Sequence, residues 1–210
     1  RPFNFRGWWD FGTGALGDMG CHHFNPPMRS LRLGAPTRLH ASATKVFTES
    51  APLASVVTFD FPARGEMPAL RALWYDGGLK PAALRDFEGR TLPDEGTLYV
   101  AEKGSLLHTW QGIQAFPETL ASKLDAVPRT LPRRGGTWDE WFEACRGGET
   151  AGCNFALADP LTTLVLLGNI AVRTGQTLAW DGDSNRFTNV TEANNLLRAT
   201  SHNGWTLEET

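Results

Sequence analysis

The stretch Gly12-Thr13-Gly14-Ala15-Leu16-Gly17-Asp18-Met19-Gly20-Cys21-His22-His23 decides the fold class. Its first six residues match G-x-G-x-x-G, the phosphate-binding fingerprint of dinucleotide-binding folds. That fingerprint needs a buried strand before it and an acidic residue about 20 positions later. Residues 6–11 lack the pattern of a buried strand, and residues 31–40 contain no Asp or Glu. We therefore reject the fingerprint, and expect glycines that let the chain pass close to a ligand before it enters a helix.

Downstream of the glycines the hydrophobic pattern changes from helical to strand-like. Apolar spacing predicts a helix over residues 14–23, which Pro26 and Pro27 end, and a second short helix over residues 28–33. Period-2 alternation then predicts strands over residues 38–47, 54–61, 69–75, 97–101 and 105–110. Because short turns rather than helices join these strands, we expect them to pair antiparallel.

The last third of the chain is predicted to be mainly helical. Residues 116–136 are rich in Pro and charge, which predicts an irregular surface segment. Capping signals at Thr137 and at Asp159-Pro160 predict helices that end before residues 147 and 175, respectively. A short strand over residues 177–180 and a helix over residues 191–199 complete the order. Helix, then strands, then helices is the order of an α+β protein.

Composition narrows the function classes. The chain of 210 residues has 20 Lys and Arg against 23 Asp and Glu, a net charge of -3. This balance excludes nucleic-acid binding through bulk positive charge. No uninterrupted apolar run reaches the roughly 20 residues that cross a bilayer, so we expect no membrane span. The chain begins with Arg1 rather than Met, and we expect it to be part of a longer protein whose upstream signal would decide between cytoplasm and periplasm.

The cysteines do not indicate a stapled scaffold. Cys21, Cys145 and Cys153 are too few for a disulfide framework and too scattered for a four-thiolate zinc site. We expect free thiols, although Cys145 and Cys153 could close a short loop in an oxidising compartment.

Asp18 and His22 are the first candidates for chemistry. At positions i and i+4 of a helix they share one face, where the carboxylate can orient the imidazole. Such a pair can move a proton to or from a substrate hydroxyl, but it can equally be an ordinary surface pair. Cys21, His22 and His23 are consecutive and point to different sides of a helix, so we expect no metal site.

Aromatic residues beside polar groups are candidates for substrate binding. Trp8 and Trp9 precede Asp10, and indole faces next to a carboxylate suit a sugar or polyol; the same tryptophans could be core anchors. The turn over residues 74–81 places Tyr75 and Lys80 either at the rim of a pocket or in a solvated hairpin.

Residues 6–22, Arg6-Gly7-Trp8-Trp9-Asp10-Phe11-Gly12-Thr13-Gly14-Ala15-Leu16-Gly17-Asp18-Met19-Gly20-Cys21-His22, resemble the entry into the C-terminal domain of the Gfo/Idh/MocA oxidoreductases, the relatives of glucose-fructose oxidoreductase and inositol dehydrogenase. Further similar segments follow in order over nearly the whole chain, at residues 33–37, 74–81, 92–96, 102–104, 166–171, 173–175 and 180–181.

The resemblance implies a fold and an assembly. Residues 1–210 would be a single substrate-binding and oligomerisation domain, a large, mostly antiparallel open sheet with helices on one face. The N-terminal Rossmann domain, which binds NAD or NADP in such proteins, would lie outside this chain. The resemblance also implies a homo-oligomer that forms through the sheet face, in a bacterial protein.

The resemblance further implies an activity. Asp18 and His22 match a D-x-x-x-H element that acts with a Lys of the N-terminal domain, so hydride would pass between nicotinamide and a sugar, polyol or related carbohydrate. His22 would handle the hydroxyl proton and Asp18 would orient it, while the substrate pocket would be shaped by Arg6, Trp8, Trp9, Asp10, Tyr75 and Lys80. The chain alone would bind no dinucleotide and be inactive. Two alternatives stay open: an NAD-dependent glycosidase, and a non-catalytic carbohydrate-binding or oligomerisation module.

Overall fold

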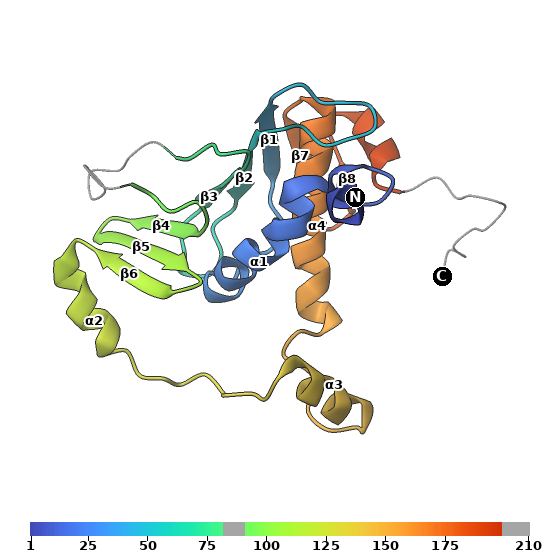
Figure 1. Ribbon diagram of the computed structural model, residues 1–210. Coiled ribbons are helices and arrows are strands. Elements are labelled where there is room, and N and C mark those ends of the chain that lie inside the picture. Colours follow the sequence, from blue (N-terminus) through green and yellow to red (C-terminus); the bar gives the residue numbers. More distant parts are fainter. Residues whose placement is uncertain (82–90, 199–210) are drawn as a thin grey trace. The chain divides into compact units, whose positions relative to one another are not determined.

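The computed structural model describes residues 1–81 and 91–198, in which the chain forms two compact units. The first unit comprises Arg1–Leu79 and Pro160–Thr210, and the second comprises Lys80–Asp159. Helices and antiparallel strands occur in separate runs along the chain, which confirms the α+β class (Figure 1). That residues 1–210 behave as a single domain stays a prediction.

A five-stranded sheet forms the centre of the first unit. Its spatial order is β3-β2-β1-β7-β8, and every neighbouring pair is antiparallel, as predicted. Pairing between β1 and β7 joins two parts of the chain that are far apart in sequence. The strands are β1 (Arg38–Ala43), β2 (Ser55–Phe61), β3 (Leu70–Tyr75), β7 (Leu178–Asp181) and β8 (Arg186–Phe187).

Helix α1 (Gly14–Ser30) follows the short 3₁₀ helix η1 (Pro2–Gly7). Gly14 has φ of +67°, a conformation that favours glycine, and this bend admits the chain into α1. The predicted helix end at Pro26 and Pro27 is wrong, because α1 continues through both residues. Proline removes a helical donor, but Phe24, Pro27 and Met28 are buried, so tertiary packing supports this last turn.

Helix α4 (Phe155–Thr174) begins earlier than the predicted start at Asp159-Pro160. The N–H groups of Leu157 and Ala158 both donate to the carbonyl of Asn154, so Pro160 lies inside the helix rather than at its first position. By length and composition α4 could cross a membrane. Burial of its residues 164, 165, 167 and 170–172 in the core accounts for the same apolarity. The absence of a membrane span stays a prediction.

Two glycines allow α1, α4 and the sheet to approach closely (Figure 1). A Cβ atom on Gly168 of α4 would lie 2.6 Å from Leu16 Cδ2 and 2.8 Å from Phe59 Cζ. A Cβ atom on Gly20 of α1 would lie 2.8 Å from Val165 Cγ1. The surrounding core combines one face of the sheet with both helices, and its most deeply buried members include Leu16, Leu39, Val57, Phe59, Leu164, Val165, Ala171, Leu178 and Phe187.

The second unit contains a separate three-stranded antiparallel sheet, in the order β4-β5-β6. Its strands are β4 (Thr97–Ala101), β5 (Gly104–Thr109) and β6 (Gly112–Phe116), and its helices are η3 (Glu118–Leu120), α2 (Ala121–Asp125) and α3 (Thr137–Cys145). The strands of the α+β fold are therefore divided between two sheets. Leu107 and Phe116 are the buried residues of its hydrophobic cluster.

Several predicted boundaries need correction. Strand β6 was not predicted, and the segment expected to be irregular from residue 116 is helical over η3 and α2. The N-cap of α3 is Gly136 rather than Thr137, because the Asp139 carboxylate accepts a hydrogen bond from Gly136 N at 3.0 Å. The predicted helix over residues 191–199 is the 3₁₀ helix η4 (Thr191–Leu196), and residue 199 lies outside the described residues.

Candidate functional site

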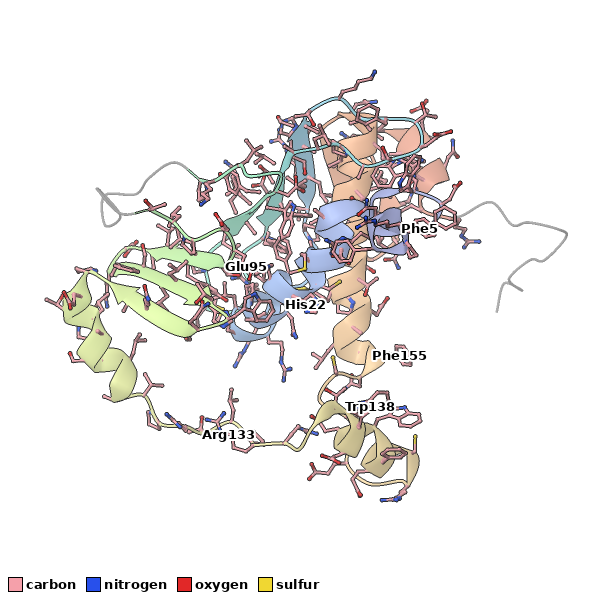
Figure 2. The ribbon with its side chains drawn as sticks, viewed as in Figure 1. Phe5, His22, Glu95, Arg133, Trp138 and Phe155 are labelled. Atoms are coloured by element: carbon pink, nitrogen blue, oxygen red, sulfur yellow. The ribbon has the colours of Figure 1, made fainter. Side chains whose placement is uncertain are left out.

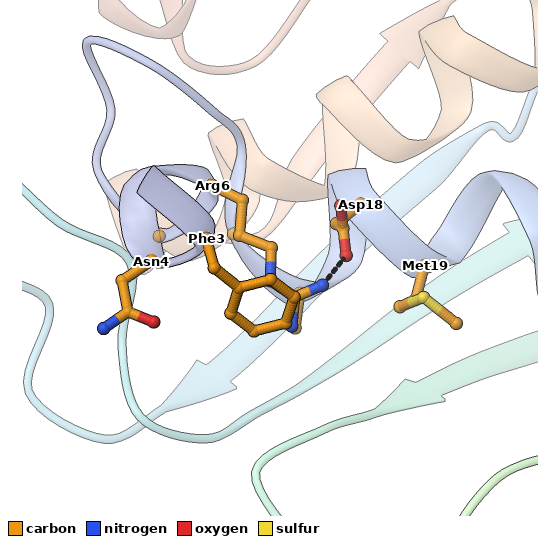
Figure 3. A pocket seen from close by; sticks show the side chains of 8 residues that line it. Phe3, Asn4, Arg6, Asp18 and Met19 are labelled. Carbon is orange, nitrogen blue, oxygen red and sulfur yellow. Dashed lines mark hydrogen bonds and ion pairs between the residues drawn. The ribbon is translucent and has the colours of Figure 1, made fainter. Parts of the chain in front are cut away.

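A concavity of about 310 Å³ lies in the first unit, between η1 and the first turns of α1 (Figure 3). Both elements are needed to form it, because η1 supplies its aromatic, amide and guanidinium groups while α1 supplies a carboxylate and a thioether. Its lining residues are Phe3, Asn4, Arg6, Gly7, Gly14, Ala15, Asp18 and Met19.

An ion pair between Arg6 and Asp18 lines this concavity (Figure 3). Arg6 Nη1 donates to Asp18 Oδ2 at 2.5 Å, and the guanidinium carbon lies 4.3 Å from the centre of the Phe3 ring. The two charged side chains are 47% and 33% exposed, so solvent screens the pair and it contributes only about 0–1 kcal/mol to stability. Its chemical consequence is larger, since a guanidinium donor and a carboxylate acceptor stand side by side where a hydroxylated ligand could reach them.

His22 lies one helical turn beyond Asp18 on α1 and is exposed (Figure 2). The helix predicted to carry both residues is therefore present. Asp18 Oδ2 accepts a hydrogen bond from Arg6, which belongs to η1, whereas Asp18 and His22 both belong to α1. The structure thus shows Asp18 paired with Arg6, and the pairing of Asp18 with His22 and the catalytic roles of both residues stay predictions.

Trp8, Trp9 and Asp10 follow η1 but do not line the concavity. Trp9 N donates to Glu49 O at 2.9 Å, and Trp9 Nε1 donates to Phe47 O at 3.3 Å. Trp8 forms an isolated β-bridge with Ser50 and is 45% exposed, and Asp10 is exposed. These contacts tie the start of the chain to the loop after β1, and the substrate-binding roles of all three residues stay predictions.

The predicted rim residues Tyr75 and Lys80 belong to different units. Tyr75 ends β3, and the next residue, Asp76, organises the turn. The Asp76 carboxylate accepts hydrogen bonds from Ser55 N at 2.5 Å, from Ser55 Oγ at 2.8 Å and from Trp74 Nε1 at 2.8 Å. In the second unit, Lys80 Nζ donates to Leu92 O at 2.8 Å and to Asp94 Oδ1 at 3.0 Å. Substrate binding by either residue stays a prediction.

Phe3, Asn4 and Met19 line the concavity and were missed by the sequence analysis. Phe3 and Asn4 belong to the run Pro2-Phe3-Asn4-Phe5-Arg6, which brings aromatic, amide and guanidinium groups together immediately before the Trp8-Trp9-Asp10 segment. This grouping is the sequence signal from which Phe3 and Asn4 could have been proposed as binding residues. Its use depends on η1, because the turn returns these side chains towards α1.

The glycine motif does not fit a dinucleotide. It is preceded by η1 rather than by a strand, and a Cβ atom on Gly12 would lie 2.5 Å from Arg6 Cα. A Cβ atom on Gly17 would clash with the Thr13 side chain, and Asn169 Nδ2 donates to Thr13 O at 2.9 Å. Gly12 and Gly17 therefore serve close packing of the chain at the start of α1, and their close approach to a ligand stays a prediction.

Neither a metal cluster nor a disulfide is present in the part of the chain that the structure describes. Within residues 1–81 and 91–198, no group of three or more His, Cys, Asp and Glu could hold a metal ion. Cys21, Cys145 and Cys153 are free; Cys145 and Cys153 are exposed, while burial raises the pKa of the Cys21 thiol.

Comparison with known proteins shows only distant similarity to solved structures. No family model matches the chain, and no curated protein matches it. A solved structure described as "putative oxidoreductase from Thermotoga maritima" is 14% identical, with a TM-score of 0.40. The match covers 76% of this chain and 45% of that protein, so the chain spans less than half of its length. An identity and TM-score this low carry no information about the chemistry of this site.

Proposed function

We propose that the chain is the substrate-binding part of an NAD(P)-dependent oxidoreductase that acts on a sugar, polyol or related carbohydrate. The observation that carries the proposal is the Arg6–Asp18 ion pair, which lines an open concavity. Asp18 lies one helical turn before His22 on α1. The same proposal is supported by the segments between residues 6 and 181 that resemble, in the same order, segments of the Gfo/Idh/MocA oxidoreductases.

Each polar group has a role in this proposal. Arg6 donates hydrogen bonds to a substrate hydroxyl and holds the Asp18 carboxylate, which orients His22. His22 exchanges the proton of the reacting hydroxyl, since an imidazole ring nitrogen can accept or donate a proton and so serve as base or acid. The exposed Phe3 and Phe5 rings offer apolar faces for the C–H groups of a carbohydrate.

The cofactor would be bound outside this chain. The glycine motif of this chain does not have the strand-turn-helix context that a dinucleotide requires. We expect no saturable binding when NAD or NADP is titrated into residues 1–210, and saturable binding would contradict this division of roles.

The catalytic assignment is tested in the full-length protein. His22→Ala should lower kcat by roughly 10²- to 10⁴-fold and abolish the pH dependence that the imidazole imposes. Asp18→Asn should lower kcat less and shift the pH profile, because the imidazole keeps its position but loses a neighbouring charge. His108→Ala is the matched control in strand β5 of the second unit. Unchanged turnover and pH profile in His22→Ala would refute the assignment.

The same assays separate the alternatives. Consumption of added NAD or NADP indicates a dehydrogenase, whereas release of a leaving group with no net redox change indicates an NAD-dependent glycosidase. Carbohydrate binding without turnover indicates a non-catalytic module. Sedimentation of the full-length protein tests the homo-oligomer that the resemblance implies.

A further inference from the structure

A second concavity, of about 320 Å³, lies on the other face of the five-stranded sheet. Strand β1 alternates buried and exposed residues, so Leu39 and Ala41 point to the helix-covered core while Arg38 and His40 point to the opposite face. Every residue that lines this concavity is polar, and all of them belong to the first unit: Arg38, His40, Thr58, Asp60, Arg71 and Thr177.

Strand register arranges the charges of this concavity in a row. Arg38 of β1 pairs with Asp60 of β2, and Asp60 pairs in turn with Arg71 of β3. One carboxylate therefore stands between two guanidinium groups, because directly opposed residues on one face of a sheet are neighbours. The next row brings His40 opposite Thr58.

The two arginines differ in their hydrogen bonding. Arg71 Nε donates to Asp60 Oδ1 at 2.7 Å, and this bond raises the pKa of the guanidinium. Arg38 forms no ion pair with any residue that the structure describes. With two cations and one carboxylate, the concavity has one positive charge in excess.

Hydroxyl and imidazole groups complete the lining. Thr177 Oγ1 lies 3.3 Å from His40 Nδ1, and Thr58 adds a second hydroxyl. A guanidinium fork donates two parallel hydrogen bonds to a carboxylate or a phosphate, and hydroxyls donate further bonds to the same oxygens. The volume is at the lower end of the roughly 300–1,000 Å³ range of ligand pockets, so it suits a small ligand.

We propose that this concavity is a binding site for a small oxyanion, the carboxylate or phosphate group of a small molecule. Arg38 is the principal anchor, Arg71 provides the second positive charge, and Thr58 and Thr177 donate hydrogen bonds. This site lies apart from the Arg6–Asp18 concavity, with which it shares no lining residue, and it does not depend on the function proposed above.

Titration with inorganic phosphate and, separately, with acetate tests the proposal. The 210-residue chain is titrated at constant ionic strength, and backbone amide chemical shifts are followed by NMR. We expect saturable shifts at the six lining residues. Arg38→Ala should raise the dissociation constant on the order of tenfold, because it removes a charge-assisted hydrogen bond. Arg186→Ala, an exposed change in strand β8 of the same sheet that does not line the concavity, should leave the constant unchanged.

The direction in which Asp60→Asn changes the dissociation constant is the decisive test of the proposal. Removal of the only carboxylate should lower the dissociation constant several-fold, because the anion no longer faces a like charge. Weaker binding by Asp60→Asn would overturn the proposal, as would the absence of saturation or an equal loss in Arg186→Ala. Saturation by phosphate alone would identify a phosphate site, and saturation by both probes a general oxyanion site.

A second copy of the chain is the competing occupant of this face, and sedimentation distinguishes it. If Arg38→Ala dissociates a dimer and neither anion binds to the monomer, a carboxylate of the second copy occupies the concavity and the proposal fails. All of these variants change residues at the sheet surface. Far-UV circular dichroism of each variant verifies that the fold is retained.

Discussion

The two units of this chain differ in how much apolar surface they bury. The first unit packs α1 and α4 on one face of a five-stranded sheet. The second unit has Leu107 and Phe116 as the buried residues of its cluster, its α3 has no buried residue, and Trp138 is 73% exposed (Figure 2). Because burial supplies most of the stability of a domain, we expect the first unit to resist unfolding and the second to open locally.

Matched leucine truncations, one in each unit, should give the largest difference in stability between the two units. Leu39 is 0% exposed in β1, and Leu39→Ala should destabilise the chain by about 3–5 kcal/mol through a lost core contact and a cavity. Leu107 is 7% exposed in β5, and Leu107→Ala should cost about 1–2 kcal/mol, since fewer buried neighbours surround it. Urea denaturation measures both, and amide hydrogen exchange should show the second effect confined to β4–β6. Equal costs would contradict the comparison.

Glycine packing in the first unit should give the next largest effect. Gly168→Ala places a methyl group 2.6 Å from Leu16 Cδ2 and should destabilise by about 1–3 kcal/mol, because the close-packed core must shift. Gly34→Ala is the control, since a Cβ atom there meets nothing within 4 Å and should change the midpoint little. The measurement is the shift of the thermal or urea midpoint. A neutral Gly168→Ala would show that the α1–α4 contact is looser than described.

Matched Asp→Asn changes compare the stabilising effect of one carboxylate in each unit, at Asp76 and at Asp94. Asp76→Asn in the first unit puts an amide donor against the donors Ser55 and Trp74, at a cost of about 1–3 kcal/mol. Asp94→Asn in the second unit removes a solvated partner of Lys80 and should leave the urea midpoint unchanged. If both variants lose the same stability, the Asp76 turn has no special structural role.

The smallest effect should come from Asp181 at the end of β7, because its carboxylate accepts local hydrogen bonds from the turn that follows. Hydrogen bonds from the Ser184 hydroxyl and from the N–H groups of Asp183 and Ser184 hold the pKa of Asp181 below its usual range. Since the folded pKa is depressed, this stabilisation is present above the unfolded pKa of about 4 and is lost as pH falls through the folded value. Ser184→Ala should move the NMR titration midpoint of the carboxyl carbon upward. An unchanged midpoint would exclude the hydroxyl as the main cause.

Much of the secondary structure could be predicted from local patterns. Strands β1 to β5 and β7 follow alternation or β-branched content, and their ends differ from the prediction by a few residues. Strand β6 was missed because three of its five residues are exposed, so alternation gives little signal, and the two residues of β8 are too short for any pattern. Pairing with β5 and β7 creates these strands.

The candidate site was only partly predictable. Asp18 and His22 are recognisable from the sequence because four residues make one helical turn. The Arg6–Asp18 pair joins residues 12 positions apart on two elements, and no local period links them. The pair exists because the bend at Gly14 and the turn of η1 return Arg6 to the side of α1.

The sequence by itself determined the α+β class, the antiparallel pairing of neighbouring strands and the helix that carries Asp18 and His22, since these depend on periodicity and turn residues. Only the tertiary structure decided that β7 pairs with β1, that the strands divide into two sheets, and that α1 and α4 continue through their prolines. The physical reason is that burial of apolar surface acts between residues distant in sequence, and its free energy exceeds the local preferences on which helix and strand signals rest.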